Sequence, residues 1–164
     1  MALPCTHRGA ARRCSPASLI DPMTFLVHRT EAIVEWGHCD PIGMAFPSRV
    51  FEYLDAGSWA LFRAALGVEP PMLASTFGIM GIPLVDARLR ALAPLRFGDH
   101  IEVFSNVSAF RRSSFDVEHQ LMVRGALAVE GRETRVWAGA DAADRSKLHA
   151  LPIPDEVKAK FTTG

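Results

Sequence analysis

One stretch of regular helical spacing limits the folds that are open to this chain. Between residues 48 and 66, apolar or small side chains recur at steps of three and four residues, which predicts one face of an α-helix of about five turns. Pro47 suits the first helical position, where its missing N–H would be unpaired anyway, and Gly67 suits the position after the last turn. The apolar face of this helix needs a partner surface. Its positions are Val50, Phe51, Leu54, Ser58, Leu61, Phe62 and Ala65.

Strand-like segments on both sides of the helix supply that surface. A segment rich in β-branched residues predicts a strand at 26–36, and the glycines and prolines of 37–47 predict a loop. A short connecting segment at 72–79 leads to expected strands at 82–94, 99–111, 114–124 and 127–139, with turns at 96–99 and 125–126, and then to a terminal helix at 154–161. The simplest arrangement is α+β, with the long helix lying across a curved antiparallel sheet.

One of these strands shows which face of the sheet meets water. Between residues 114 and 124, Asp116, Glu118 and Gln120 alternate with apolar side chains. Alternation of this kind is expected of an antiparallel sheet with one solvated face. We therefore expect these three polar side chains to lie on the outer, exposed face.

The bulk composition limits the partners and the location of the protein. The 164 residues suit one domain, which we place at 24–164, behind a disordered or irregular N-terminal extension at 1–23. An organelle-targeting segment is an alternative for this Arg-containing extension. Eighteen basic residues balance eighteen acidic ones, so we expect no partner that is a nucleic acid or a membrane. Three widely spaced cysteines favour a reducing, cytoplasmic location.

Asp40 is the candidate catalytic residue. It lies in the loop between the first strand and the long helix, where a helix start offers unpaired backbone N–H groups. Such N–H groups can hold an oxyanion, and a carboxylate beside them can act as a nucleophile or as a general base. The alternative is a turn or capping aspartate, because Asp-Pro is a common turn dipeptide.

Longer segments extend this interpretation to a family. The segments 34–46 (VEWGHCDPIGMAF) and 51–56 (FEYLDA) resemble the hydroxybenzoyl-CoA thioesterase branch of the hot-dog superfamily. The segment 110–115 (FRRSSF) is similar to the basic turn of that family, 134–138 (TRVWA) to its last strand, and 151–154 (LPIP) to its tail. These matches occur in the right order from residue 27 to about residue 160.

The resemblance implies a hot-dog fold and hydrolysis of an acyl-CoA thioester. The sequence shows no metal-binding cluster and this hydrolysis needs none, so we expect no metal and no cofactor. Asp40 matches the catalytic aspartate, and the first amides of the long helix match the oxyanion site. The position of the expected amide donor falls on Pro47, which has no N–H, so the N–H of Ser48 or of Gly43 must replace it. The resemblance also implies homodimers, paired into dimers of dimers, with active sites at the subunit interface.

Further residues are expected to bind the substrate. Met44 and Phe46 follow Asp40 directly and are candidates to line the acyl pocket, while Asp55 is a candidate to orient water or substrate. The alternative for Asp55 is a polar helix position at the dimer boundary. The acyl group stays open between an aromatic acid and an aliphatic acid.

The basic turn is the candidate site for the phosphates of CoA. The resemblance places Arg111 and Arg112 there, and guanidinium groups match phosphate oxygens well. Ser113 stands where a relative has a third basic residue, which implies a weaker or differently shaped nucleotide site. The alternative is a solvated hairpin end.

The remaining reactive side chains have simpler interpretations. Cys39 is expected to be a small buried side chain and His119 a structural one, while His38 is a weaker candidate for tuning Asp40. A non-catalytic acyl-CoA-binding hot-dog protein is an alternative, favoured by Pro47. An enoyl-CoA hydratase or dehydratase is less favoured, because no histidine follows Asp40 until His100. Trp36, Phe46, Phe51, Trp59, Phe62 and Phe77 are interpreted as mostly core.

Overall fold

A computed structural model describes residues 25–140 and 147–162 of the chain. The N-terminal extension that the sequence predicts at 1–23 lies outside the described residues. The division of the chain into this extension and one domain at 24–164 stays a prediction. Within the described part of the chain, no helix is long and apolar enough to cross a membrane.

The long helix α1 runs from Pro47 to Leu66, one residue longer than the predicted range. Pro47 occupies its first turn, as expected, since proline fits a position whose N–H has no helical partner. Gly67 ends the helix in the left-handed conformation, with φ of 72°, and its N–H donates to the Arg63 carbonyl oxygen at 2.9 Å. The spacing of apolar residues thus identified this element correctly.

Five antiparallel strands form the main sheet, in the order β1-β3-β4-β5-β2. The turn between β4 and β5 uses Arg124 and Gly125, both with positive φ, as two-residue hairpins require. The outer strands β1 and β2 leave one edge each unpaired within the described chain. The strands are β1 Val27–Ile33, β2 Leu84–Ala91, β3 His100–Phe110, β4 Ser114–Val123 and β5 Ala126–Val136.

Several short elements differ from the expectations. The first strand ends earlier than predicted, because residues Trp36–His38 form a 3-10 turn, η2. The expected connection at 72–79 contains a 3-10 turn η3, Pro70–Met72, and a short helix α2, Leu73–Phe77. The last predicted strand divides at Trp137 into β5 and β6, Ala138–Ala140, and β6 pairs with β7, Leu148–Ala150. The terminal helix α3 covers Asp155–Ala159.

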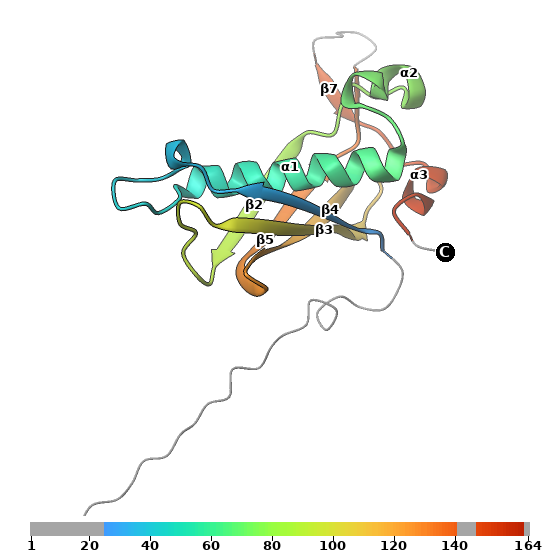
Figure 1. Cartoon of the computed structure of the whole chain (residues 1–164). Helices are drawn as coiled ribbons and strands as arrows, with labels where there is room; N and C mark the ends of the chain where they lie inside the picture. Colours follow the sequence, from blue (N-terminus) through green and yellow to red (C-terminus); the bar gives the residue numbers. More distant parts are fainter. Residues whose placement is uncertain (1–24, 141–146, 163–164) are drawn as a thin grey trace, which may run out of the picture.

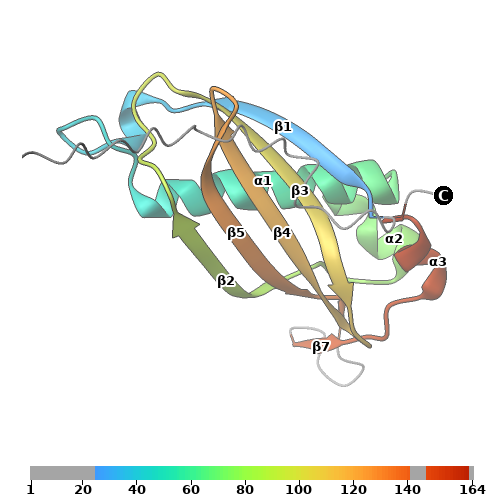
Figure 2. The same cartoon turned by 90° about the horizontal axis from the view of Figure 1, so that it is seen from below.

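Helix α1 lies against the concave face of the sheet, which curves around it (Figures 1 and 2). Two glycines allow this close approach. A Cβ atom added at Gly57 on the helix would lie 2.7 Å from Ser105 Oγ, and one added at Gly131 on β5 would collide with Leu54. Side chains from both layers form the core between them. This architecture is the hot-dog fold that the resemblance implies. The core includes Leu54, Leu61, Phe62, Val103, Val107, Phe115, Val117 and Leu121.

Candidate active site

The loop that carries Asp40 is closed by backbone hydrogen bonds across it. Asp40 N–H donates to the Met44 carbonyl oxygen at 2.8 Å, and Phe46 N–H donates to the His38 carbonyl oxygen at 2.9 Å. Gly43 has a φ of 78°, a conformation that glycine adopts at little cost, and its N–H donates to the Asp40 carbonyl oxygen at 2.9 Å. The loop therefore holds residue 40 in a fixed position just before α1.

The carboxylate of Asp40 is anchored through one oxygen. Its Oδ1 accepts hydrogen bonds from the N–H groups of Ile42, at 3.0 Å, and Met44, at 2.9 Å. These are the contacts of the turn that was the alternative interpretation of Asp40. No donor of the described chain hydrogen-bonds Oδ2. The carboxylate is thus oriented by its own loop and keeps one oxygen available for chemistry.

The start of α1 leaves a backbone donor without a partner. The helix has no side-chain cap and no acidic residue in its first turn. Pro47 lacks an N–H, and the amides of Gly43 and Phe46 already donate within the loop. Among the described residues, no acceptor receives the N–H of Ser48. Of the two amides considered as replacements, that of Ser48 is therefore the one left open.

Exposed aromatic side chains surround this loop, contrary to expectation. Trp36 and Phe97 are 59% and 57% exposed and meet edge to face, with ring centroids 5.5 Å apart. Phe46 is 44% exposed and Ile42 is 73% exposed. Assigning Trp36 and Phe46 to the core was wrong, whereas Phe62 is buried as expected. We call Trp36, Phe46 and Phe97 the aromatic patch.

His38 connects the loop to the helix rather than standing free. Its Nδ1 lies 2.8 Å from the hydroxyl of Tyr53, which is on the second turn of α1. Burial is the largest cause of a raised pKa of Tyr53, so this hydroxyl stays protonated and can donate to the imidazole. Cys39 is a free thiol and only half-buried, so the expected full burial is not observed. The sequence did not single out Tyr53.

The predicted CoA-phosphate residues lie on the turn between β3 and β4. The guanidinium of Arg111 is engaged by Asp116, through Nη1 to Oδ1 at 3.0 Å and Nη2 to Oδ2 at 2.7 Å. Arg112 is exposed and makes no ion pair with a described residue, while Ser113 is half-buried. Asp116 was expected to be exposed, but its side chain has no accessible surface, because charged partners cover it. Arg112 is thus the freer of the two cations.

The structure places Asp40 and this turn at opposite ends of the sheet. The Asp40 loop contacts the start of β3, where Phe97 N–H donates to the Gly43 carbonyl oxygen at 3.0 Å. Arg111 directly follows the end of β3 (Figure 2). A strand of eleven residues at about 3.3 Å per residue separates the two groups by roughly 30 Å. One protomer therefore does not bring its own Asp40 and arginines together.

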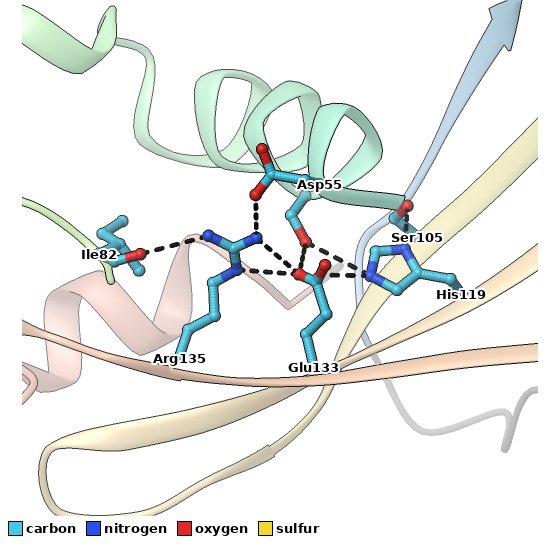
Figure 3. A network of polar contacts seen from close by, with 7 residues as sticks. Asp55, Ile82, Ser105, His119, Glu133 and Arg135 are labelled. Atoms are coloured by element: carbon cyan, nitrogen blue, oxygen red, sulfur yellow. Dashed lines mark hydrogen bonds and ion pairs between the residues drawn. The ribbon is translucent and has the colours of Figure 1, made fainter. Parts of the chain in front are cut away.

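Asp55 belongs to a polar network between α1 and the sheet (Figure 3). It pairs with Arg135, whose side chain is 2% exposed and lies over the rings of Trp59 and Phe62. Arg135 in turn donates to Glu133 Oε2 through Nε at 2.9 Å and Nη2 at 2.8 Å. The side chain of Asp55 is 46% exposed, so it connects the buried network to the surface.

The other end of this network is fully buried. Glu133 accepts the hydroxyl of Ser58 at 2.6 Å, and His119 lies between Ser58 and Ser105, with its Nδ1 2.8 Å from Ser105 Oγ. Burial alone would raise the pKa of Glu133, but hydrogen bonds from His119 and Ser58 and the charge of Arg135 outweigh it and set the pKa at about 2. His119 is buried in this network.

Sequence reasoning missed this network as a whole. Its available signal was the pair of charged residues Glu133 and Arg135, two apart in a strand and hence on one face, opposite a helix face that includes Ser58. No group of His, Cys, Asp and Glu in the described chain could hold a metal ion.

Comparisons with known proteins agree with this fold. Residues 34–161 match the family model described as the thioesterase-like superfamily. The curated 4-hydroxybenzoyl-CoA thioesterase of Pseudomonas sp. (strain CBS-3) is 27% identical over 129 residues, covering 74% of this chain and 87% of its own length.

Two solved structures are similar along most of the chain. A mutant of 4-hydroxybenzoyl CoA thioesterase complexed with 4-hydroxybenzoyl CoA has a TM-score of 0.75 at 22% identity, covering 82% of this chain and 98% of that one. A gentisyl-coenzyme A thioesterase has a TM-score of 0.69 at 26% identity, covering 82% and 99%. The hot-dog fold is thereby confirmed, and the expected class of enzyme, a thioesterase, is confirmed with it. The chain belongs to the thioesterase-like superfamily.

Proposed function

We propose that Asp40 supplies the reactive carboxylate with which this thioesterase hydrolyses an acyl-CoA thioester. The observation that carries this proposal is the anchoring of Oδ1 by the amides of Ile42 and Met44, which leaves Oδ2 unbonded at the start of an uncapped helix. A carboxylate held in this way loses little conformational freedom when it reacts. Cys39 is not needed as a nucleophile.

Two chemical routes fit this geometry. As a nucleophile, Oδ2 attacks the thioester carbon, CoA leaves as the thiolate, and water hydrolyses the resulting mixed anhydride. As a general base, the carboxylate takes a proton from a water that attacks the same carbon, and this proton later protonates the thiolate. Both routes form an oxyanion on the carbonyl oxygen and restore the carboxylate at the end.

The N–H of Ser48 is the proposed donor to that oxyanion. Of the amides considered, it is the one without an acceptor in the described chain, and its place in the first turn of α1 adds the positive end of the helix dipole. The expected donor position falls on Pro47, which has no N–H, and in this proposal Ser48 takes its place. The Gly43 amide is a poorer candidate because it already donates to the Asp40 carbonyl oxygen.

A complete site requires a second copy of the chain. Asp40 and the turn with Arg111 and Arg112 are roughly 30 Å apart along β3 of one protomer. We infer a homodimer in which Asp40 of one protomer faces the arginines of its partner, with dimers pairing further into tetramers. Exposed apolar side chains on the edge strand β2, Leu84 and Val85, support such an assembly. The sparse cysteines support a cytoplasmic location.

An aromatic acyl group is the proposed substrate class. The aromatic patch lies beside Asp40 and offers ring faces and edges to a planar acid. Two of the relatives are named for aromatic acids, 4-hydroxybenzoate and gentisate. Met44 and Phe46 complete the expected lining of the pocket. The side chain of Asp55 is 46% exposed, so it is accessible to orient a substrate.

Replacement of Ser48 tests the oxyanion assignment. Ser48→Pro removes the backbone N–H, and a second consecutive proline is tolerated in a first turn, as Pro70 and Pro71 show in η3. We expect kcat for 4-hydroxybenzoyl-CoA, followed by thiol release, to fall by about 10²–10³-fold, the usual effect of losing one oxyanion donor.

Ser48→Ala is the matched control, because it keeps the N–H and loses the hydroxyl. It should retain a kcat within about threefold of the wild-type value, since the hydroxyl has no proposed role. Equal losses in both variants would assign the effect to the side chain and contradict the proposal. A wild-type protein that binds acyl-CoA without releasing thiol would instead support the non-catalytic alternative.

A further inference from the structure

A buried carboxylate on the outer face of the sheet holds two arginines at one place. Oδ1 of Asp116 accepts Arg111 Nη1 at 3.0 Å and Thr134 Oγ1 at 2.8 Å, and Oδ2 accepts Arg111 Nη2 at 2.7 Å and Arg132 Nη2 at 2.6 Å. The hydrogen bond from Arg111 is the largest cause that keeps the pKa of Asp116 far below its ordinary value. Asp116 is therefore charged, and both of its oxygens are fully used.

The direction of the Arg132 side chain is informative. Arg132 on β5 stands directly across from Glu118 on β4, an exposed acidic residue. Its guanidinium pairs with Asp116 instead, which is two residues closer to the turn that carries Arg111 and Arg112. Glu118 makes no ion pair with a described residue. Asp116 thus draws Arg132 toward the basic turn.

This arrangement leaves positive charge at the turn. Two guanidinium groups share one carboxylate, and Arg112, which is exposed, follows Arg111 in the same turn. The side chains of Arg111 and Arg132 are 51% and 54% exposed. Each guanidinium carries five N–H donors, so Arg132, which uses one group on Asp116, keeps most of its donors for a ligand.

The backbone around these cations is held in place by two segments that follow β5 in the sequence. Ile153 N–H donates to the Arg112 carbonyl oxygen at 2.8 Å, and Trp137 N–H donates to the Ser113 carbonyl oxygen at 2.9 Å. The turn is therefore a fixed platform rather than a loose hairpin end. A fixed set of forked donors suits phosphate oxygens.

We propose that Arg132 is a further phosphate-binding residue of the CoA site and that Asp116 is the positioning residue that aims Arg132 and Arg111 at the nucleotide. The inference rests on the proposed acyl-CoA function. Ser113 stands where a relative has a third basic residue. In this proposal, Arg132 on β5 supplies the third cation instead of a residue of the turn. The ligand group is a phosphate of the nucleotide half of CoA.

Calorimetric titration of the full-length protein with CoA tests this assignment. Arg132→Gln should raise the Kd for CoA about tenfold, which corresponds to about 1.4 kcal/mol for one charge-assisted hydrogen bond. Arg132→Lys keeps the positive charge but loses the forked donors, so we expect its Kd to lie between those of wild type and Arg132→Gln. Arg90→Gln is the matched control, because Arg90 is an exposed arginine of the same sheet that pairs with Glu130; its Kd should not change.

Kinetics with two substrates separate a phosphate contact from a structural effect. In Arg132→Gln, the KM for 4-hydroxybenzoyl-CoA should rise about tenfold. The kcat/KM for the same acyl group on pantetheine, which carries no nucleotide phosphate, should stay at the wild-type value. Unchanged affinity for CoA, or equal losses on both esters, would overturn the role of Arg132. A wild-type protein that hydrolyses neither ester would refute the proposed function, while the titrations would still decide the role of Arg132.

Discussion

Removing the charge of Glu133 probes the buried network between α1 and the sheet. Its side chain is 1% exposed and accepts hydrogen bonds from Ser58 and twice from Arg135. Glu133→Gln keeps the shape of the side chain but leaves the buried guanidinium of Arg135 with Asp55 as its remaining acidic partner. Asp55 is 46% exposed, so water weakens the compensation that it provides.

The expected cost is a large part of the total stability. Breaking a buried ion pair by neutralising one partner costs about 3–5 kcal/mol, and the remaining pair with Asp55 places the expected loss near the lower end, about 3 kcal/mol. With an m-value of about 2 kcal/mol per M of urea, the unfolding midpoint should fall by about 1.5 M. Equilibrium urea unfolding, followed by tryptophan fluorescence, measures this shift.

Two further variants identify the cause of the loss. Ser58→Ala removes one neutral donor to the same carboxylate and should cost about 1 kcal/mol. Arg135→Met in the Glu133→Gln background removes the unbalanced charge, so the double variant should be more stable than Glu133→Gln alone. The reasoning fails if the free energy of unfolding of Glu133→Gln lies within about 0.5 kcal/mol of the wild-type value, or if the double variant is no more stable than Glu133→Gln alone.

Two more predictions concern packing and acid stability. Gly131→Ala places a Cβ against Leu54 and should destabilise the fold by about 1–3 kcal/mol, whereas Gly37→Ala, whose Cβ would meet no atom within 4 Å, should leave the urea midpoint unchanged. Glu133 has a folded-state pKa of about 2 against an ordinary value of 4.5, so its contribution is fully present above pH 4.5 and is lost as the pH falls toward 2. In wild type, the free energy of unfolding should therefore fall by about 3 kcal/mol over this range from Glu133 alone, and Glu133→Gln should lack that part of the decrease. Parallel pH profiles for the two proteins would contradict this assignment.

The fold was largely predictable because its signals are local. The bounds of α1 were predicted to within one residue, from the helical spacing of residues 48–66 and from Pro47 and Gly67 at its two ends. Alternation and turn residues gave the antiparallel strands, although their ends shifted. The break at Trp137 was not predictable, because beyond it the chain pairs with β7 and with Gly81 instead of with β4. Tertiary contacts of this kind leave no periodic trace in the sequence.

The site was predictable in its residue types but not in its arrangement. Asp40 stood out because a carboxylate before a helix start has a clear chemical meaning. The separation of Asp40 from Arg111 follows from the length and direction of β3, which became visible once the strands were paired. The pairing of Arg132 with Asp116 across strands was missed because alternation alone marks both as solvent-facing. The exposure of Trp36 was missed because composition favours burial of large aromatic residues.

The rate of thiol release by Asp40→Asn tests the central claim most directly. The amide side chain keeps the shape of the carboxylate and can still accept the hydrogen bonds from Ile42 and Met44, but it is neither a nucleophile nor a general base. With 4-hydroxybenzoyl-CoA we expect kcat to fall by at least about 10³-fold. The Kd for CoA should stay within about twofold of the wild-type value, and the urea midpoint should stay within about 0.3 M of it. An Asp40→Asn protein that releases thiol at a rate comparable to that of wild type would show that another group performs the hydrolysis.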